Sequence, residues 1–139
     1  AHGNEPSHHI IYLYAYSNEP KKGQKYIYQV INEFHNNTPD GMIGNDDCGQ
    51  MSAWYILSTL GFYPVNPANG EFVLGSPLVK KASIHFSNGK KLEIAANNFS
   101  DATIYNEVRI LNNKVIKIPF ITYQDIMKGG ILTFNMTNE

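Results

Sequence analysis

Gly44-Asn45-Asp46-Asp47-Cys48-Gly49-Gln50 leads directly into an apolar segment of helical character, Met51 to Leu60, and this junction organises the chain. Acidic side chains suit a helix entry because they accept hydrogen bonds from the first free N–H groups and complement the helix dipole. One Asp satisfies that need. A second Asp, with flanking glycines that let another group approach, indicates a carboxylate held for chemistry or for a ligand. The spacing alone leaves both a structural cap and a functional acid open.

The rest of the chain divides near residue 70 into a helical part and a β part. Ser7 to Tyr16 is apolar on all sides, which is typical of a buried helix. A second helix is expected from about Lys21 to Phe34, after Pro20. A third is expected from about Gln50 to Leu60, with Gly61 as its C-cap.

After residue 70 the apolar residues alternate with a period of two. Ile84 and Phe86, then Leu92 and Ile94, flank Asn88-Gly89, which predicts a hairpin. A second strand pair is expected at 103–111 and 114–118, then a short helical turn from 122 and a last strand at 131–136. The sequence therefore predicts an α+β fold with helices in residues 1–69 and an antiparallel β region in residues 70–139.

Composition narrows the function classes. With 139 residues, 42% of them hydrophobic, the chain has the size of one domain with one core. The net charge is −1 and the lysines form no stripe, so nucleic acid is not an expected partner. No apolar run approaches the roughly 20 residues of a membrane span. A single cysteine excludes an internal disulfide framework and a cysteine-rich zinc site, and it leaves the compartment open. The polar start without Met is what a fragment of a longer protein would show.

Asn4 and Glu5 offer two oxygen donors beside a proline. Calcium takes 6–8 oxygen ligands, so this pair could supply one corner of a calcium site. The residues by themselves favour a structural interpretation, in which the pair forms the N-terminal turn of the first helix with Ser7 as its cap.

The remaining chemical candidates are weaker. His8 and His9 are adjacent, whereas two zinc ligands on one helix face need i, i+4 spacing; we expect one to face the site and the other to pack. Cys48 could be a nucleophile, but neighbouring carboxylates raise a thiol pKa, which favours a small packed residue. Trp54 lies in an apolar run and is expected in the core.

Several motifs resemble, in the same order, the C-terminal part of the family 92 glycoside hydrolases, which are exo-acting α-mannosidases. The motifs are Gly3-Asn4-Glu5-Pro6-Ser7-His8-His9, Pro39-Asp40-Gly41, Gly44 to Tyr55, Gly61-Phe62-Tyr63-Pro64-Val65 and Gly75-Ser76-Pro77-Leu78. The resemblance is most specific up to Leu78 and continues more loosely to Leu132.

The resemblance implies calcium-dependent hydrolysis of terminal α-mannosides, α-1,2-linked ones among them, with inversion at the anomeric carbon. It places Asn4 and Glu5 at the calcium and substrate site, and it makes Asp47 the general base. Many members of the family carry Asp-Glu-Asp where this chain has Asn45-Asp46-Asp47. The resemblance therefore leaves open whether Asn45 binds the substrate or orients the water, and whether Asp46 shares the catalytic role.

The resemblance also implies the final helices of an (α/α)6 barrel, followed by strands that pack on it. In the family the general acid is a Glu upstream of this chain, so the expected partners are α-mannoside glycans and the upstream remainder of the chain. Neighbouring Asp46 and Asp47 are poor candidates for the acid–base pair, because an inverting glycosidase separates its carboxyls by about 6.5–9.5 Å so that they address opposite faces of the sugar. The family suggests a bacterial secreted, periplasmic or surface enzyme. The alternative is a non-catalytic carbohydrate-binding or structural module.

Overall fold

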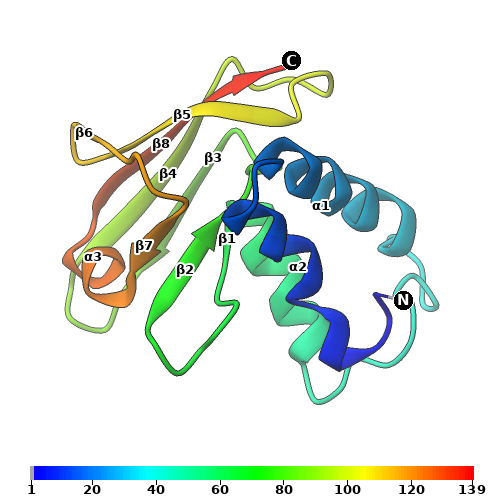
Figure 1. The fold of residues 1–139 in the computed structure, drawn as a ribbon. Helices are drawn as coiled ribbons and strands as arrows, with labels where there is room; N and C mark the ends of the chain where they lie inside the picture. Colours follow the sequence, from blue (N-terminus) through cyan, green and yellow to red (C-terminus); the bar gives the residue numbers. More distant parts are fainter. Residues whose placement is uncertain (1) are drawn as a thin grey trace.

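The computed structural model describes residues 2–139 and has an α+β fold, which confirms the predicted class. Figure 1 shows the N-terminal helices gathered on one side of the molecule and the strands, with one short helix, on the other; the first β-strands lie at the junction. The C-terminus lies at the end of the last strand.

The N-terminal segment differs from its prediction. A buried helix was expected over residues 7–16, but the structure has a short 3₁₀ turn, η1 (Glu5–Ser7), followed by a 3₁₀ helix, η2 (Ile10–Tyr16). Within η2 only Tyr12 is buried, and Ile10, Leu13 and Tyr16 are exposed. A 3₁₀ helix has three residues per turn, so side chains three apart align on one face. The spacing of these three residues therefore places them together on the open face of η2.

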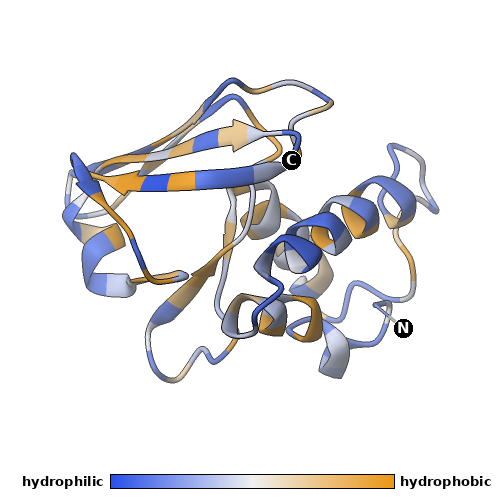
Figure 2. Cartoon of the chain, turned by 45° about the horizontal axis from the view of Figure 1, so that its top comes forward, coloured by the Kyte–Doolittle hydropathy of each residue, from blue (hydrophilic) through white to orange (hydrophobic). Residues whose placement is uncertain are grey.

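Two α-helices agree with the predictions. They are α1 (Pro20–Phe34) and α2 (Gln50–Leu60). Pro20 suits the first turn of α1 because its fixed φ is helical and it needs no hydrogen-bond acceptor there. Gly61 ends α2 at φ 95°, as the C-cap expectation requires. In Figure 2, hydrophobic and hydrophilic residues alternate along α1, which is the pattern of a helix with one buried side.

A five-stranded sheet forms most of the β part. Its strand order is β3 (Lys81–His85), β4 (Lys91–Asn97), β8 (Gly130–Thr137), β5 (Tyr105–Leu111) and β6 (Lys114–Val115). The two predicted strand pairs and the last strand are confirmed. An antiparallel arrangement was expected, and it holds for the pairs β3–β4, β5–β6 and β5–β8. The pair β4–β8 differs, because its strands are parallel. The short helix α3 (Tyr123–Lys128), with Thr122 as its N-cap, precedes β8 and agrees with the helical turn expected from residue 122.

A small antiparallel sheet joins the two parts and was not predicted. It contains β1 (Phe62–Tyr63), β2 (Glu71–Leu74) and β7 (Phe120–Thr122) in the order β1-β2-β7. These strands have only two to four residues each, too few to show a period of two. Because β1 precedes residue 70 and pairs with β2, this sheet contains strands from both sides of the predicted division at 69/70. The division of the chain into two parts at that point stays a prediction.

The core consists of two hydrophobic clusters. One lies between the five-stranded sheet and the small sheet, around Phe134 and Leu92. The other lies in the helical part, where Trp54 and Tyr12 pack with residues of α1. Trp54 is fully buried, which confirms its expected place in the core. Among residues 2–139, no helix combines the length and apolar character that crossing a membrane requires.

Candidate active site

The acidic loop, residues 44–50, has an unusual backbone. Asp47, Cys48 and Gly49 have φ values of 50°, 59° and 93° in succession. Left-handed backbone at a non-glycine residue costs roughly 1–2 kcal/mol, so two such residues before the glycine require support from neighbouring contacts. The carbonyl of Asp47 accepts from the Gln50 N–H at 3.2 Å, and that of Asp46 accepts from the Met51 N–H at 3.0 Å. These bonds attach the loop to the start of α2.

The Asp46 carboxylate is bound to the helix. Its Oδ1 accepts hydrogen bonds from the backbone N–H of Ser52 at 2.9 Å and from Ser52 Oγ at 2.8 Å. Gly49, at the N-cap position, has no side chain that could cap the helix. Asp46 therefore supplies the cap from three residues further back, and its geometry matches the structural role.

The Asp47 carboxylate is available. It has no hydrogen-bond partner among residues 2–139, and the residue is half-buried. Asn45 is exposed and its side chain is likewise without a hydrogen-bond partner in the described chain. The structure thus gives the neighbouring aspartates different surroundings, one anchored and one with both oxygens accessible to a ligand.

Cys48 was expected to be a small packed residue, and this prediction is wrong. The thiol is free and exposed. The left-handed backbone at positions 47–49 turns the loop outward, so that the Cys48 side chain points away from the core.

The second candidate segment is the turn containing Asn4 and Glu5. Both residues are exposed. Their carbonyls accept from the N–H groups of Ser7 at 2.8 Å and His8 at 3.2 Å, while neither side chain makes a hydrogen bond within residues 2–139. Ser7 was considered as the helix cap, but it is the last residue of η1, and His9 occupies the N-cap position of η2. The turn leaves its side-chain oxygens free.

The fold brings this turn to the acidic loop. Gly44 has φ 75°, and a Cβ there would lie 2.5 Å from the carbonyl oxygen of Gly3. A Cβ at Gly3 would lie 3.2 Å from the Ile43 side chain. Gly3 and Gly44, about forty positions apart in the sequence, therefore lie in close contact, and a larger residue would not fit there. Asn4 and Asn45 are the residues that follow them.

A polar contact missed by the sequence analysis lies beneath these segments. Gln50 Nε2 donates to the hydroxyl of Tyr63 at 2.9 Å and lies 3.4 Å from His8 Nδ1. Trp54 Nε1 donates to the His8 carbonyl at 3.0 Å. Gln50 and Tyr63 both belong to the quoted motifs, but their side-chain partners lie 13 to 42 positions away, which no local pattern reveals.

Histidines and aromatic rings fill the space below this contact. The His2 ring lies 4.2 Å from the Trp54 ring and 5.0 Å from that of His8, measured between centroids. Burial, together with the charges of His8 and His35, lowers the pKa of His2 to about 4. His8 is fully buried and His9 half-buried, in agreement with the expectation that one of them packs. The His2 side chain is therefore neutral at physiological pH.

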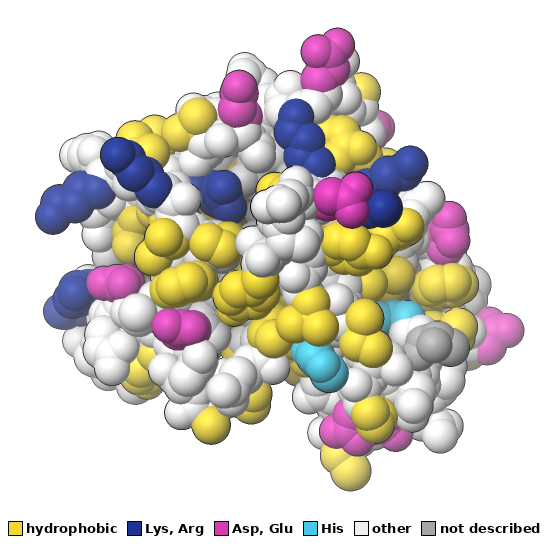
Figure 3. Space-filling view, viewed as in Figure 1, with side chains coloured by type: hydrophobic (Ala, Val, Ile, Leu, Met, Phe, Trp, Pro, Cys, Tyr) yellow, Lys and Arg dark blue, Asp and Glu magenta, His cyan; other side chains and the backbone are white. Residues whose placement is uncertain are grey.

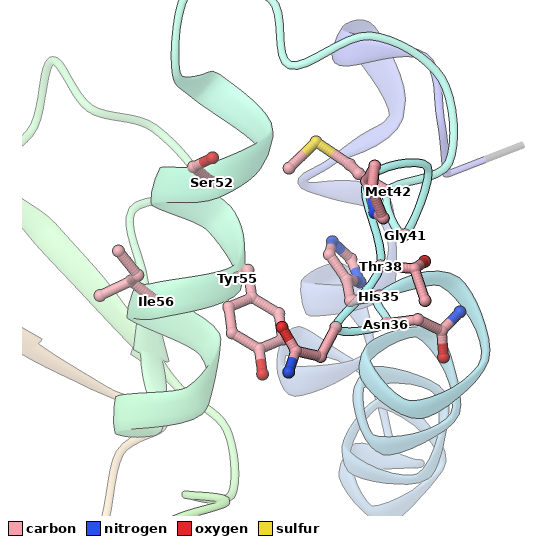
Figure 4. A pocket seen from close by; sticks show the side chains of 10 residues that line it. His35, Asn36, Thr38, Gly41, Met42, Ser52, Tyr55 and Ile56 are labelled. Atoms are coloured by element: carbon pink, nitrogen blue, oxygen red, sulfur yellow. The ribbon is translucent and has the colours of Figure 1, made fainter.

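A separate open pocket of about 680 Å³ lies between α2 and the loop after α1. Figure 4 shows Ser52, Tyr55 and Ile56 on the α2 side and His35, Asn36, Thr38 and Met42 on the loop side. Neither Asp46 nor Asp47 lines it. Tyr55 and Ile56 are exposed at this pocket. Ile10, Leu13 and Tyr16 of η2 are also exposed, and Figure 3, viewed as Figure 1, shows many hydrophobic side chains on the face of the molecule that it displays.

The predicted calcium ligands fit only part of a calcium shell. The free oxygens of Asn4 and Glu5 are of the right chemical type for this cation. Within residues 2–139, however, no three His, Cys, Asp or Glu side chains are grouped so that they could hold a metal ion. With 6–8 oxygens needed, this chain could supply a corner of the site, and other groups would have to complete it.

Comparisons with known proteins agree with these motifs. Residues 1–138 match the family described as the glycosyl hydrolase family 92 catalytic domain. The fold is similar to the family GH92 alpha-mannosidase BT3965 from Bacteroides thetaiotaomicron, solved in complex with mannoimidazole. The two share 45% identity with a TM-score of 0.95, over 99% of this chain and 18% of that chain.

Two further proteins are similar over the whole length of the chain. The family GH92 inverting mannosidase BT2199 from Bacteroides thetaiotaomicron VPI-5482 shares 37% identity with a TM-score of 0.92, over 100% of this chain and 19% of that chain. An uncharacterized secreted glycosidase from Arthroderma benhamiae is 29% identical over 140 residues, which is 99% of this chain and 18% of that protein. The chain thus spans less than a fifth of the length of each of these three proteins.

Proposed function

Because this chain belongs to glycosyl hydrolase family 92, we propose that it is part of an exo-acting α-mannosidase that hydrolyses terminal α-mannosides, α-1,2-linked ones among them, with inversion. The observation that carries this proposal is the accessible Asp47 carboxylate on a loop that touches the Asn4–Glu5 turn. The similar structures are named as mannosidases, one of them as inverting.

In the proposed reaction Asp47 is the general base. Its carboxylate accepts a proton from a water molecule as the water oxygen bonds to the anomeric carbon. The bond from that carbon to the glycosidic oxygen breaks, and an acid outside residues 2–139 protonates the leaving oxygen. Asp46, bound to Ser52, is unsuited to the acid role because its carboxylate caps α2 on the same loop. Its proposed part is to hold the loop.

Substrate and calcium are assigned to the N-terminal turn. Asn4 and Glu5 would contribute oxygens to both, with Asn45 contacting the sugar or the attacking water. Calcium, when bound, supplies a positive charge that attracts sugar hydroxyl groups. The free side chains of Asn4 and Glu5 support this assignment, since a turn that served only the fold would more often use such groups as caps.

The proposed partners are α-mannoside glycans and the remainder of a longer chain. The exposed residues Ile10, Leu13, Tyr16 and Ile56 support the second partner, because a catalytic domain of the relatives' length offers surface to cover them. A sharp, concentration-independent thermal transition of residues 1–139 alone would contradict this. A secreted location is proposed from the name of the Arthroderma benhamiae relative.

The function is tested by anomer-resolved proton NMR of α-1,2-mannobiose hydrolysis by the full-length enzyme, with calcium and with a chelator. We expect β-mannose as the first product and loss of turnover with the chelator. Initial α-mannose would exclude inversion. Hydrolysis of no α-mannoside at all would favour a non-catalytic carbohydrate-binding module.

A further inference from the structure

The contact between Gln50 and Tyr63 joins three parts of the site. Gln50 follows the acidic loop as the first residue of α2, and Tyr63 lies in β1. The Gln50 side-chain amide donates to the Tyr63 hydroxyl at 2.9 Å and approaches His8, the residue after η1, at 3.4 Å. A single amide thus touches the elements that carry the acidic loop and the Asn4–Glu5 turn.

The Asn4–Glu5 turn is connected to this contact through His8. The backbone N–H of His8 donates to the Glu5 carbonyl at 3.2 Å, and the His8 ring nitrogen Nδ1 lies 3.4 Å from the Gln50 amide nitrogen. The Tyr63 hydroxyl accepts from the same amide and therefore holds it in place beside His8.

The surroundings hold this pair rigidly. Tyr63 is 6% exposed, and its ring stacks on that of Tyr12 with 5.1 Å between centroids. Trp54 fixes the His8 backbone through its hydrogen bond to the carbonyl. Close packing of these rings restricts the Tyr63 hydroxyl to one position relative to α2. Loss of the Gln50 side chain should therefore disturb the contacts that hold the Asn4–Glu5 turn.

Resting on the proposed function, we propose that Gln50 and Tyr63 are positioning residues that hold the Glu5 turn at a fixed place relative to Asp47. Neither side chain is required to touch the reacting atoms. Their effect is to fix His8, and with it the turn that carries Glu5, while Gln50 also fixes the end of the loop that bears the base. Groups behind the ligands of a metal typically change affinity or activity by about 10–100-fold when removed.

The test uses the full-length enzyme with the variants Tyr63→Phe and Gln50→Met. Tyr12→Phe is the matched control, because it removes a buried hydroxyl from the same ring cluster, one that donates to Ser58 at 2.7 Å and takes no part in the Gln50–Tyr63 contact. Calcium affinity by isothermal titration calorimetry and kcat and KM on α-1,2-mannobiose are measured for each, with thermal midpoints as the folding check.

We expect Tyr63→Phe and Gln50→Met to weaken calcium binding and lower kcat/KM by about 10–100-fold, while Tyr12→Phe changes neither. Combining Tyr63→Phe with Gln50→Met should add little to the single changes, because the two side chains share one hydrogen bond. An active wild type whose Tyr63→Phe form keeps its calcium affinity and kcat/KM overturns the positioning role alone. A wild type that neither hydrolyses mannosides nor binds calcium overturns this inference together with the proposed function.

Discussion

The different surroundings of the two aspartates give a direct test of their roles. Asp46→Ala removes the acceptor of two hydrogen bonds from Ser52, at 2.9 and 2.8 Å. Losing a helix N-cap costs about 0.5–2 kcal/mol, and hydrogen bonds to a charged group lie at or above the upper end of that range. Asp46 is exposed, so water compensates part of the loss, and we expect about 1–2 kcal/mol of local destabilisation at the start of α2.

Hydrogen exchange with mass spectrometry on the full-length enzyme measures this effect without requiring two-state unfolding. A loss of this size should speed exchange in peptides covering residues 46–60 by about 5–30-fold. Ser52→Ala should give a smaller increase, since the backbone N–H still donates to the carboxylate. Asp40→Ala is the control, because it removes a carboxylate from the preceding polar loop that makes no hydrogen bond within residues 2–139.

The reasoning is refuted if Asp46→Ala exchanges like the Asp40→Ala control while its kcat falls as far as that of an Asp47 variant. Asp46 would then be a chemical group, and the Ser52 hydrogen bonds would be incidental to its role.

Three further predictions use the same enzyme. Asp47→Asn should lower kcat by about 10²–10⁴-fold with little change in KM or in exchange over 46–60, because Asn tolerates the left-handed backbone; unchanged kcat would remove Asp47 as the base. Gly44→Ala should lower the thermal midpoint more than Gly89→Ala, since both glycines have φ near 75° (75° and 77°) but only the first would place a Cβ against Gly3; equal shifts would contradict the close contact. Burial lowers the folded-state pKa of His35, so its contribution to stability is present above the unfolded pKa of about 6.5 and is lost as the pH falls through that value toward the folded pKa. His35→Asn should therefore reduce the fall of the thermal midpoint on the acid side of a plot against pH. If the wild-type and variant plots run parallel, protonation of His35 does not cause that fall.

Local sequence predicted most of the secondary structure. Asn88-Gly89 specifies a tight turn and the flanking alternation specifies its strands, so the β3–β4 hairpin could be predicted without tertiary information. The same holds for the capped helix α2 and its end at Gly61. The small sheet β1-β2-β7 could not be predicted, because its short strands are stabilised by partners distant in sequence.

The first helix shows the limit of pattern reasoning. Apolar residues all round indicated a buried helix, whereas the 3₁₀ geometry of η2 gathers Ile10, Leu13 and Tyr16 on an exposed face. Cys48 was misplaced for a related reason. Its small apolar side chain favours the core, but three successive left-handed residues turn it toward solvent.

For the site, the sequence alone determined the residue types, the family and the expectation that Asp47 rather than Cys48 carries chemistry. Only the tertiary structure separated the two aspartates, by binding Asp46 to Ser52 and leaving Asp47 without a partner in the described chain. It also placed the Asn4–Glu5 turn against the acidic loop and the Tyr63 hydroxyl against the Gln50 side chain. Helix periods and turn residues act over a few positions and are written locally, whereas the surroundings of a carboxylate depend on which distant segments pack around it.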